Sequence, residues 1–241
     1  MKVPSLDARP IIVAIAGANG AGKSTFYHSF LAPESGLRFI NADVLARQLQ
    51  LDPYRAAALA ESLRAEFVRA RESFIFETVF SDREGSKLSF LKRAAATGYT
   101  VVLFFIGIQD AGVSEQRVAM RVAQGGHDVP AEKITTRFPR ILQNLRKALA
   151  ELPEVRVYDN SDLGRPYRLV TVHRDGRCIE RHEPVPRWLV PLLRSKARRD
   201  RGRALGSAEQ ANHIAHRVAR AASGAALAGA AGERTGADRR D

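Results

Sequence analysis

The chain has 241 residues, 45% of them hydrophobic, which is typical of a globular protein with one main domain. The formal net charge is +12, but residues 191–241 hold 11 Lys/Arg against 5 Asp/Glu and so carry half of it, which makes the basic charge weak evidence for nucleic-acid binding. The single cysteine, Cys178, excludes an internal disulfide, and we expect it to be buried as a small apolar residue in a cytoplasmic protein.

The first predicted element is a short buried strand at residues 11–16, followed by a glycine-rich turn and a helix. The apolar stretch that contains this strand is about eight residues long, which is too short for a signal peptide or a membrane span. From Gly17 to Ser24 the turn fits the pattern G-x-x-x-x-G-K-[ST]. We therefore predict a nucleotide-binding loop made of Gly17, Ala18, Asn19, Gly20, Ala21, Gly22, Lys23, Ser24 and Thr25.

The chemistry of phosphate binding explains this pattern. The glycines permit positive φ, so that backbone N–H groups turn inward around a phosphate, and the helix adds its positive N-terminal end. Lys23 then reaches the β- and γ-phosphates of ATP, and the Ser24 hydroxyl ligates Mg²⁺. A glycine-rich turn that carries a lysine by chance is the alternative, which the strand before it and the helix after it disfavour.

The segment after the loop supplies a candidate base. We expect a helix from Ser24 to Leu31 that Pro33 ends, and then a strand at residues 37–40. Asn41-Ala42-Asp43 follows that strand, and ligands of open α/β sheets bind at the carboxyl ends of strands. Asp43 is therefore a candidate general base. Equally, Asp43 is a candidate N-cap for a helix from Val44 to Leu49, and the two roles are compatible.

A long helix is predicted over residues 53–71, with its charged residues on a solvated face: Glu61, Arg64, Glu66 and Arg69. A buried strand at residues 73–80 follows and contains Glu77. Because an unpaired buried carboxylate is costly, Glu77 should meet a cation, a metal or a substrate hydroxyl. A salt bridge to a core arginine is the structural alternative.

The next segments predict a helix over residues 82–96, a strand over residues 99–106 and two further helices over residues 113–122 and 131–150. The helices flank a glycine-containing turn, in which we expect His127 to form structural hydrogen bonds. Arginines on two such helices suggest a mobile lid that stabilises a phosphoryl group in transfer, with ordinary solvated helix faces as the alternative. These arginines are Arg117, Arg121, Arg137, Arg140 and Arg146.

The C-terminal part begins with a last parallel strand at residues 155–158, which ends in Asp159-Asn160-Ser161. Residues 168–182 predict a β-hairpin, and prolines around Trp188 suggest a closing clasp. The predicted fold is α/β, a parallel P-loop kinase-type sheet flanked by helices, with a helical lid and this hairpin. We assign residues 1–193 to the kinase domain and residues 194–241 to a largely disordered, basic Ala/Arg-rich tail.

Together these motifs resemble the zeta toxin family of P-loop kinases, especially its compact single-domain members, over about residues 10–190. The landmarks in chain order are the phosphate loop, Asn41-Ala42-Asp43, Phe76-Glu77-Thr78-Val79, the stretch from Arg121 through Gly125-Gly126-His127-Asp128-Val129-Pro130 to Arg137, and Asp159-Asn160-Ser161.

The resemblance implies ATP-dependent phosphorylation of the 3′-hydroxyl of the amino sugar in UDP-N-acetylglucosamine. It implies that Asp43 accepts the proton of the attacking hydroxyl and that Glu77 and Thr78 hold the sugar nucleotide. Arg121 and Arg137 would neutralise the transferring phosphate, with Arg140, one helical turn further on, as the alternative to Arg137. For a toxin, an antitoxin protein is a candidate partner.

Two other functions compete with this one. One is a kinase for another small hydroxylated acceptor, such as a nucleotide or metabolite. The other is a nucleic-acid-associated ATP-binding protein that binds through its basic tail. The placement of Asp43 and Glu77 at strand ends favours a kinase.

Overall fold

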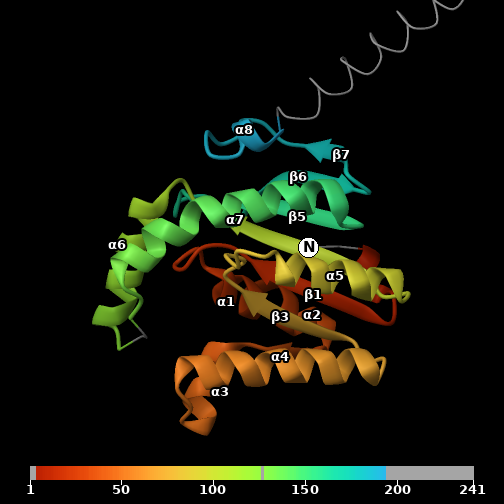
Figure 1. The fold of residues 1–241 in the computed structure, drawn as a ribbon. Helices are drawn as coiled ribbons and strands as arrows, with labels where there is room; N and C mark the ends of the chain where they lie inside the picture. The colour runs from red at the N-terminus through yellow and green to blue at the C-terminus, as the bar shows by residue number, and fades with distance from the viewer. Residues whose placement is uncertain (1–3, 126–127, 194–241) are drawn as a thin grey trace, which may run out of the picture. The chain divides into compact units, whose positions relative to one another are not determined.

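Two strongly apolar segments form the centre of a seven-stranded sheet in the computed structural model, which describes residues 4–125 and 128–193 (Figure 1). β1 (Ile11–Ala16) pairs in parallel with β4 (Thr100–Gly107), and every residue of β1 is buried. Strands that are covered on both faces carry continuous apolar runs, because neither face contacts water. The α/β fold predicted from sequence is confirmed.

The strand order is β2-β3-β1-β4-β5-β6-β7. The strands from β2 to β5 are parallel, whereas β6 and β7 add an antiparallel hairpin at one edge. The strand order reverses at β1, because β3 lies on one side of β1 and β4 on the other. Open α/β sheets bind ligands at such a point, beyond the carboxyl ends of the strands. The bounds of the remaining strands are β2 Arg38–Ile40, β3 Phe74–Thr78, β5 Glu154–Asp159, β6 Arg168–Arg174 and β7 Arg177–Arg181.

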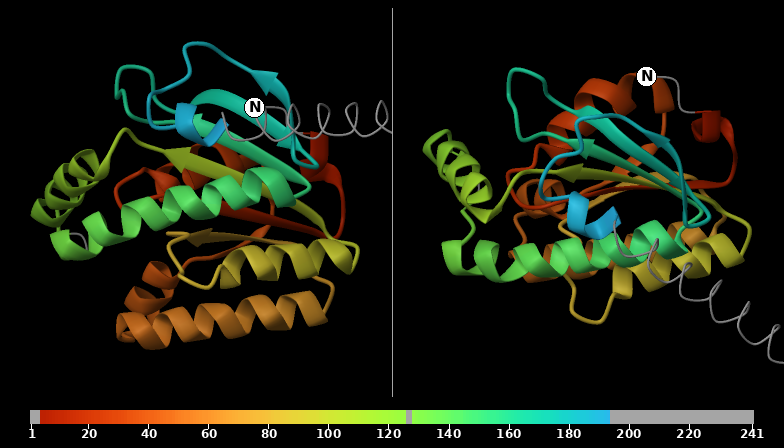
Figure 2. Two further views of the ribbon diagram at one scale, coloured as in Figure 1. Left: turned by 45° about the horizontal axis from the view of Figure 1, so that its top comes forward. Right: turned by 90° about the horizontal axis from the view of Figure 1, so that it is seen from above.

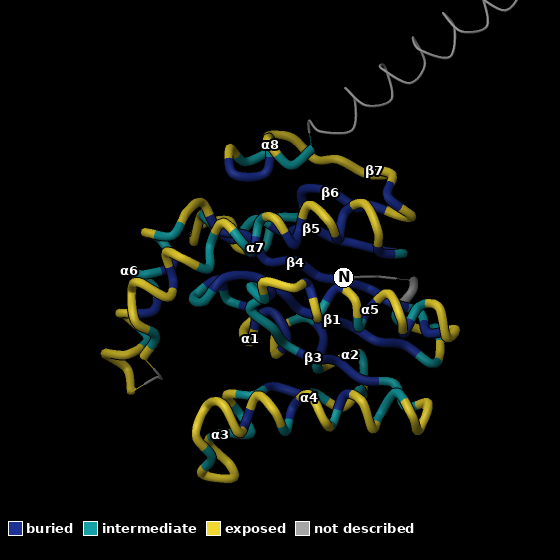
Figure 3. The backbone as a smooth tube through the Cα atoms, in the orientation of Figure 1, coloured by how far each residue is buried: buried dark blue, intermediate teal, exposed yellow. Residues whose placement is uncertain are grey.

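Helices cover both faces of this sheet (Figure 2). On one face lie α4 (Pro53–Arg69), α5 (Ser86–Ala96) and α7 (Ala131–Glu151), and on the other lies α1 (Lys23–Phe26). Buried positions follow the strands, and the helices expose their outer sides (Figure 3). In the described part of the chain, none of the helices has both the length and the apolar character needed to cross a bilayer. The shorter elements are η1 (Pro4–Asp7), α3 (Ala42–Leu49), α6 (Ala111–Ala123) and α8 (Val190–Leu193).

Alternating aromatic residues on the central strands explain how the helices attach. The Phe26 ring of α1 packs 5.6 Å from the Phe104 ring of β4. On the opposite face, the Phe76 ring of β3 lies 6.0 Å from the Phe90 ring of α5. Successive strand residues point to opposite faces, so single strands support both helical layers.

The first helix does not end at Pro33, contrary to the prediction. A five-residue π-helical segment, η2 (Tyr27–Leu31), follows α1, and α2 (Ala32–Ser35) continues to Gly36. Pro33 occupies the first turn of α2, where a missing N–H costs least. Gly36 ends the helix because its φ of 60° is left-handed.

Other expectations are also corrected. Cys178 is exposed rather than buried, because it lies on β7, an edge strand with five exposed residues. The helix predicted from residue 82 begins only at Ser86, where the Asp82 carboxylate accepts hydrogen bonds from the Ser86 hydroxyl and the Lys87 N–H. The predicted tail at residues 194–241 and the expected role of His127 lie outside the described residues.

The predicted clasp around Trp188 closes over the end of β4. Trp188 is buried, and its indole Nε1 donates a 3.1 Å hydrogen bond to Oδ1 of Asp159. Its ring lies directly against Gly107, where a Cβ atom would come 2.1 Å from Cζ2 of the indole. A glycine is therefore required at the end of β4.

We predict that Gly107→Ala lowers the free energy of unfolding by about 1–3 kcal/mol, since the added methyl overpacks the indole contact. Chemical denaturation measures this change. Gly112→Ala, in helix α6, is the matched control, because its Cβ would meet no atom closer than 3.3 Å. Equal stability of the two variants would contradict the contact.

Candidate functional site

The glycine-rich turn after β1 has the backbone that a phosphate loop requires. Gly17, Gly20 and Gly22 have φ values of 149°, 70° and 90°. At Gly17 a Cβ would come 2.2 Å from the Ile106 carbonyl oxygen, so a side chain is excluded there by contact as well as by conformation. The structure therefore places the predicted loop at the carboxyl end of β1, as expected for a nucleotide site.

Three side chains from later parts of the chain hold this loop through its carbonyl oxygens. The Ser114 hydroxyl donates to the Asn19 carbonyl at 2.6 Å, and Nδ2 of Asn160 donates to the Ala21 carbonyl at 2.8 Å. The Tyr167 hydroxyl donates to the Gly22 carbonyl at 2.9 Å. Burial raises the pKa of the Tyr167 phenol, which keeps this donor protonated.

Sequence reasoning missed these supports. Asn160 follows a predicted strand end, where its position hinted at a site, but Ser114 and Tyr167 had no motif around them. All three contacts join residues about 95 or more positions apart in the chain. Only the folded sheet brings such residues together.

Lys23 and Glu77 form the base of the site. Lys23 is 6% exposed, its Nζ donates to the Ala18 carbonyl at 2.9 Å, and it lies 3.5 Å from Oε1 of Glu77. Oε2 of Glu77 accepts hydrogen bonds from the Ser24 hydroxyl at 2.7 Å and from Nδ2 of Asn41 at 2.8 Å. Glu77 thus meets a cation, as predicted, and the cation is the loop lysine rather than a core arginine.

The donor set beside the loop fits Mg²⁺. The Ser24 hydroxyl and the Glu77 carboxylate are hard oxygen ligands of the type that Mg²⁺ takes along with waters and substrate phosphates. In residues 4–125 and 128–193 there is no group of three or more His, Cys, Asp and Glu side chains able to hold a metal alone. A magnesium ion here would therefore depend on the nucleotide for its remaining ligands.

Asp43 lies in the first turn of α3 and does not cap it, so the N-cap interpretation is wrong. Asn41 is the cap: its Oδ1 accepts from the backbone N–H of Asp43 at 2.8 Å and of Val44 at 3.2 Å. Asn41 directly follows β2, and this position just before the first helical residue places its side chain beside these N–H groups. The Asp43 carboxylate is consequently exposed and available for other contacts.

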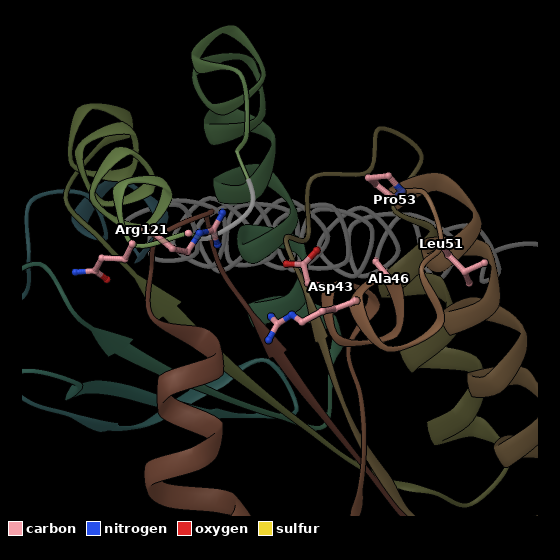
Figure 4. Close-up of a pocket in the computed structure, with 8 residues that line it drawn as sticks. Asp43, Ala46, Leu51, Pro53 and Arg121 are labelled. Carbon is pink, nitrogen blue, oxygen red and sulfur yellow. The ribbon is translucent and has the colours of Figure 1, made fainter.

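Two cavities meet at Asp43. The larger, of about 710 Å³, lies between α3 and the end of α6, with Asp43 and Arg121 on opposite sides (Figure 4). The smaller, of about 190 Å³, is lined by Asp43, Glu77 and Thr78 together with residues of α4. The Thr78 hydroxyl accepts from the Phe80 N–H at 3.2 Å, and the predicted role of Glu77 and Thr78 in holding the sugar nucleotide stays a prediction. Asp43 therefore lines both cavities.

The five arginines of the predicted lid do not line one common cavity. The two helices of the predicted lid contact each other, and the Thr135 hydroxyl of α7 donates to the Glu115 carboxylate of α6 at 2.7 Å. Only Arg121 of the five lines the cavity of Asp43. Arg117 donates to the Ser161 carbonyl at 3.2 Å and Arg146 to the Pro191 carbonyl at 3.3 Å.

Arg137 and Arg140 remain open alternatives for a second lid arginine. Arg140 lines a third cavity, of about 430 Å³, with Asp82 and Arg83, and Arg137 is partly exposed near the start of α7. Neither lines the cavity that holds Asp43 and Arg121. The structure therefore unites Asp43 with Arg121 but leaves the second arginine as a prediction.

Arg64 departs from its predicted place on a solvated face. It is 6% exposed, and it lines the small cavity beside Asp43 and Glu77. The helical pattern failed here because α4 lies against β3, and Arg64 covers the Phe76 ring with its guanidinium carbon 5.1 Å from the ring centroid.

Comparisons with known proteins give a family match that covers part of this site. The zeta toxin family model matches residues 51–168, a range that includes Glu77, Thr78, Arg121 and Arg137. No curated protein matches the chain.

Among solved structures, a chain of the AvrRxo1-ORF1:-ORF2 complex superposes with a TM-score of 0.56 at 17% identity, over 72% of this chain and 62% of that chain. The same pair crystallised with ATP gives 0.55 at 17% identity, with the same coverage. A PezAT toxin–antitoxin structure from Streptococcus pneumoniae gives 0.48 at 17% identity, over 77% of both chains. The chain thus spans less than two thirds of the AvrRxo1 chain, and the likeness concerns the fold.

We predict that Asn160→Ala weakens the binding of an ATP analogue about tenfold and destabilises the protein by about 1–3 kcal/mol, because the buried Ala21 carbonyl loses its donor. Calorimetric titration and denaturation measure the two effects. Asp162→Ala, which removes an exposed contact to the Gly164 N–H nearby, is the control. Unchanged analogue affinity in Asn160→Ala would show that this bond does not shape the loop.

Proposed function

We propose that this chain, whose residues 51–168 match the zeta toxin family model, is a P-loop kinase that phosphorylates the 3′-hydroxyl of the amino sugar in UDP-N-acetylglucosamine. One observation carries the proposal: a single cavity contains Asp43 and Arg121, and Asp43 is connected to the phosphate loop through Asn41 and Glu77. A base, a lid cation and a phosphate loop are the parts that phosphoryl transfer from ATP requires.

The phosphate loop binds the nucleotide in this proposal. Its N–H groups surround the phosphates, while Ser114, Asn160 and Tyr167 satisfy its carbonyl oxygens. Lys23 exchanges its bond to the Ala18 carbonyl for the β- and γ-phosphates. Ser24 and Glu77 would hold Mg²⁺, which supplies positive charge to the phosphate oxygens.

Asp43 acts as the base. Its exposed carboxylate accepts the proton of the sugar hydroxyl as the hydroxyl oxygen bonds to the γ-phosphorus, and the bond from that phosphorus to the bridging oxygen of ADP breaks. The amide of Asn41 fixes the N-terminus of α3 and so the position of Asp43. Positioning the hydroxyl in line with the leaving group contributes more than proton removal alone.

Arg121 supplies the cation from the lid. It lies across the cavity from Asp43, where a guanidinium stabilises charge on the phosphoryl oxygens during transfer (Figure 4). Either Arg137 or Arg140 is the second cation. Because the transition state is loose, removing Arg121 or Lys23 should harm the reaction as much as removing Asp43.

The larger cavity accommodates the acceptor. Its volume of about 710 Å³ is within the usual range for sites that bind molecules of sugar-nucleotide size. Glu77 and Thr78 hold the sugar nucleotide near Asp43 in this proposal. Activity as a toxin in the cytoplasm would call for an antitoxin protein as partner. A different small hydroxylated acceptor is the alternative function.

We predict that the purified protein, given ATP, Mg²⁺ and UDP-N-acetylglucosamine, forms a sugar nucleotide that is heavier by one phosphate in mass spectrometry. Asp43→Asn should lower the rate about 100- to 10,000-fold, because an amide cannot accept the proton. Binding of an ATP analogue should stay unchanged in this variant. Analogue binding without product in the wild type would point to another acceptor.

For the lid, we predict that Arg121→Gln lowers kcat about 100-fold or more while thermal stability stays close to that of the wild type. Arg146→Gln is the control, because Arg146 contacts the Pro191 carbonyl and not this cavity. Steady-state kinetics of both variants measure the difference. Equal kcat values would remove Arg121 from the proposed machinery.

A further inference from the structure

Arg64 is a buried cation at the wall of the small cavity. It lies on α4, is 6% exposed, and its guanidinium carbon is 5.1 Å from the Phe76 ring centroid and 6.0 Å from that of Phe90. The two rings pack against the guanidinium through cation–π contacts. Such contacts do not supply oxygen acceptors for its five N–H donors. The side chain is therefore packed by apolar groups and left with unused donors.

No described residue forms a hydrogen bond or an ion pair with Arg64. Glu61, one turn earlier on α4, influences it only through its charge and pairs instead with Lys87, 3.7 Å from Oε2 to Nζ. Burial lowers the pKa of Arg64, but an arginine stays protonated in proteins. Burying a charged guanidinium without a counter-ion lowers the stability of the protein, so the buried position of Arg64 points to a ligand that binds it.

The other charged residues that line the small cavity indicate which kind of ligand Arg64 could bind. Its charged lining residues are Asp43, Glu61, Arg64, Glu77 and Lys87. Two of the carboxylates already have cations within 4 Å, Glu61 through Lys87 and Glu77 through Lys23. Arg64 is thus the cation of this wall that is free to neutralise an incoming negative charge.

The size and position of the small cavity further limit which ligand Arg64 could bind. A volume of about 190 Å³ is below that of sites for whole drug-sized molecules, so the cavity takes one group of a larger ligand. Asp43 links it to the larger cavity of about 710 Å³. The group in the small cavity therefore belongs to the molecule whose hydroxyl faces Asp43.

We propose that Arg64 binds a phosphoryl oxyanion of the acceptor, with its planar fork of N–H donors directed at the diphosphate of the sugar nucleotide. The identity of the acceptor rests on the proposed function, but the anion site does not. Arg64 would thereby select acceptors that carry phosphate over neutral sugars, since guanidinium groups match phosphate geometry. Its role is binding and orientation of the acceptor, without contact to the transferred phosphate.

The test measures pyrophosphate binding by calorimetry, with the phosphate loop filled by Mg²⁺ and a non-hydrolysable ATP analogue. We expect Arg64→Met to weaken pyrophosphate binding at least tenfold, the loss typical of hydrogen bonds to charged groups. Arg69→Met is the matched control, because Arg69 lies on the same helix with its side chain 73% exposed and paired with Glu66. Arg69→Met should stay within twofold of the wild type.

A second arm uses the proposed acceptor and its neutral part. UDP-N-acetylglucosamine should bind Arg64→Met at least tenfold more weakly than wild type, whereas free N-acetylglucosamine should not distinguish the two. If wild type makes no phosphorylated product from UDP-N-acetylglucosamine, the proposed function fails and the pyrophosphate titration still decides the role of Arg64. If product forms with an unchanged KM in Arg64→Met, the inference about Arg64 fails alone.

Thermal unfolding separates ligand binding from a structural role. Removing a buried, unpaired charge should leave the Tm of the unliganded protein unchanged or raise it. A lower Tm with wild-type pyrophosphate affinity would mean that Arg64 only packs against the phenylalanine rings, and would overturn the proposal. So would a wild type that does not bind pyrophosphate. If Arg64→Met does not fold, Arg64→Lys replaces it, and its single charge without the fork should still weaken pyrophosphate binding severalfold.

Discussion

The phosphate loop can direct its N–H groups inward only if its carbonyl oxygens, which then point outward, find donors elsewhere. Ser114, Asn160 and Tyr167 supply those donors from α6, from the end of β5 and from the segment before β6. Buried carbonyl groups without partners are costly, so the loop conformation depends on the rest of the domain being folded. In turn, the lid helix and the C-terminal hairpin are attached to the nucleotide site by the same bonds. The arrangement makes the loop a junction of the fold rather than an isolated motif.

Glu77 connects this junction to the acceptor side. The parallel register pairs it with Ile15, two residues before the loop begins, so its carboxylate lies beside Lys23 and Ser24. The same carboxylate accepts from Asn41, which caps α3 and positions Asp43. A substitution at Glu77 would therefore disturb both the nucleotide and the acceptor side, which makes such a variant hard to interpret alone. In the proposed kinase, this shared carboxylate aligns the two substrates.

The charged residues around the cavities differ in whether they have an ion-pair partner. Glu61 and Glu77 have lysine partners, whereas Asp43 and Arg64 line the cavity without an ion pair among the residues described. Unpaired charges lower stability when buried, and they are tolerated where a ligand uses them. Arg121 lines the larger cavity from α6, one of the two helices of the predicted lid. The proposed acceptor would complete a set of charges that the protein leaves open.

The sequence by itself determined the local features: the phosphate loop, the central strands, the hairpin and the strand-end carboxylates. These follow from backbone geometry and short-range periodicity, which act over a few residues. The sequence also indicated which chemistry the residues suit, and the family match agrees with that indication. It did not determine that Asn41 rather than Asp43 caps α3, that a π-helical segment carries the first helix past Pro33, or that Arg64 is buried. The supports of the loop and the shared cavity at Asp43 were equally inaccessible, because they join residues distant in the chain. Only the tertiary structure decided them, since burial and long-range hydrogen bonds depend on which helix lies on which strand.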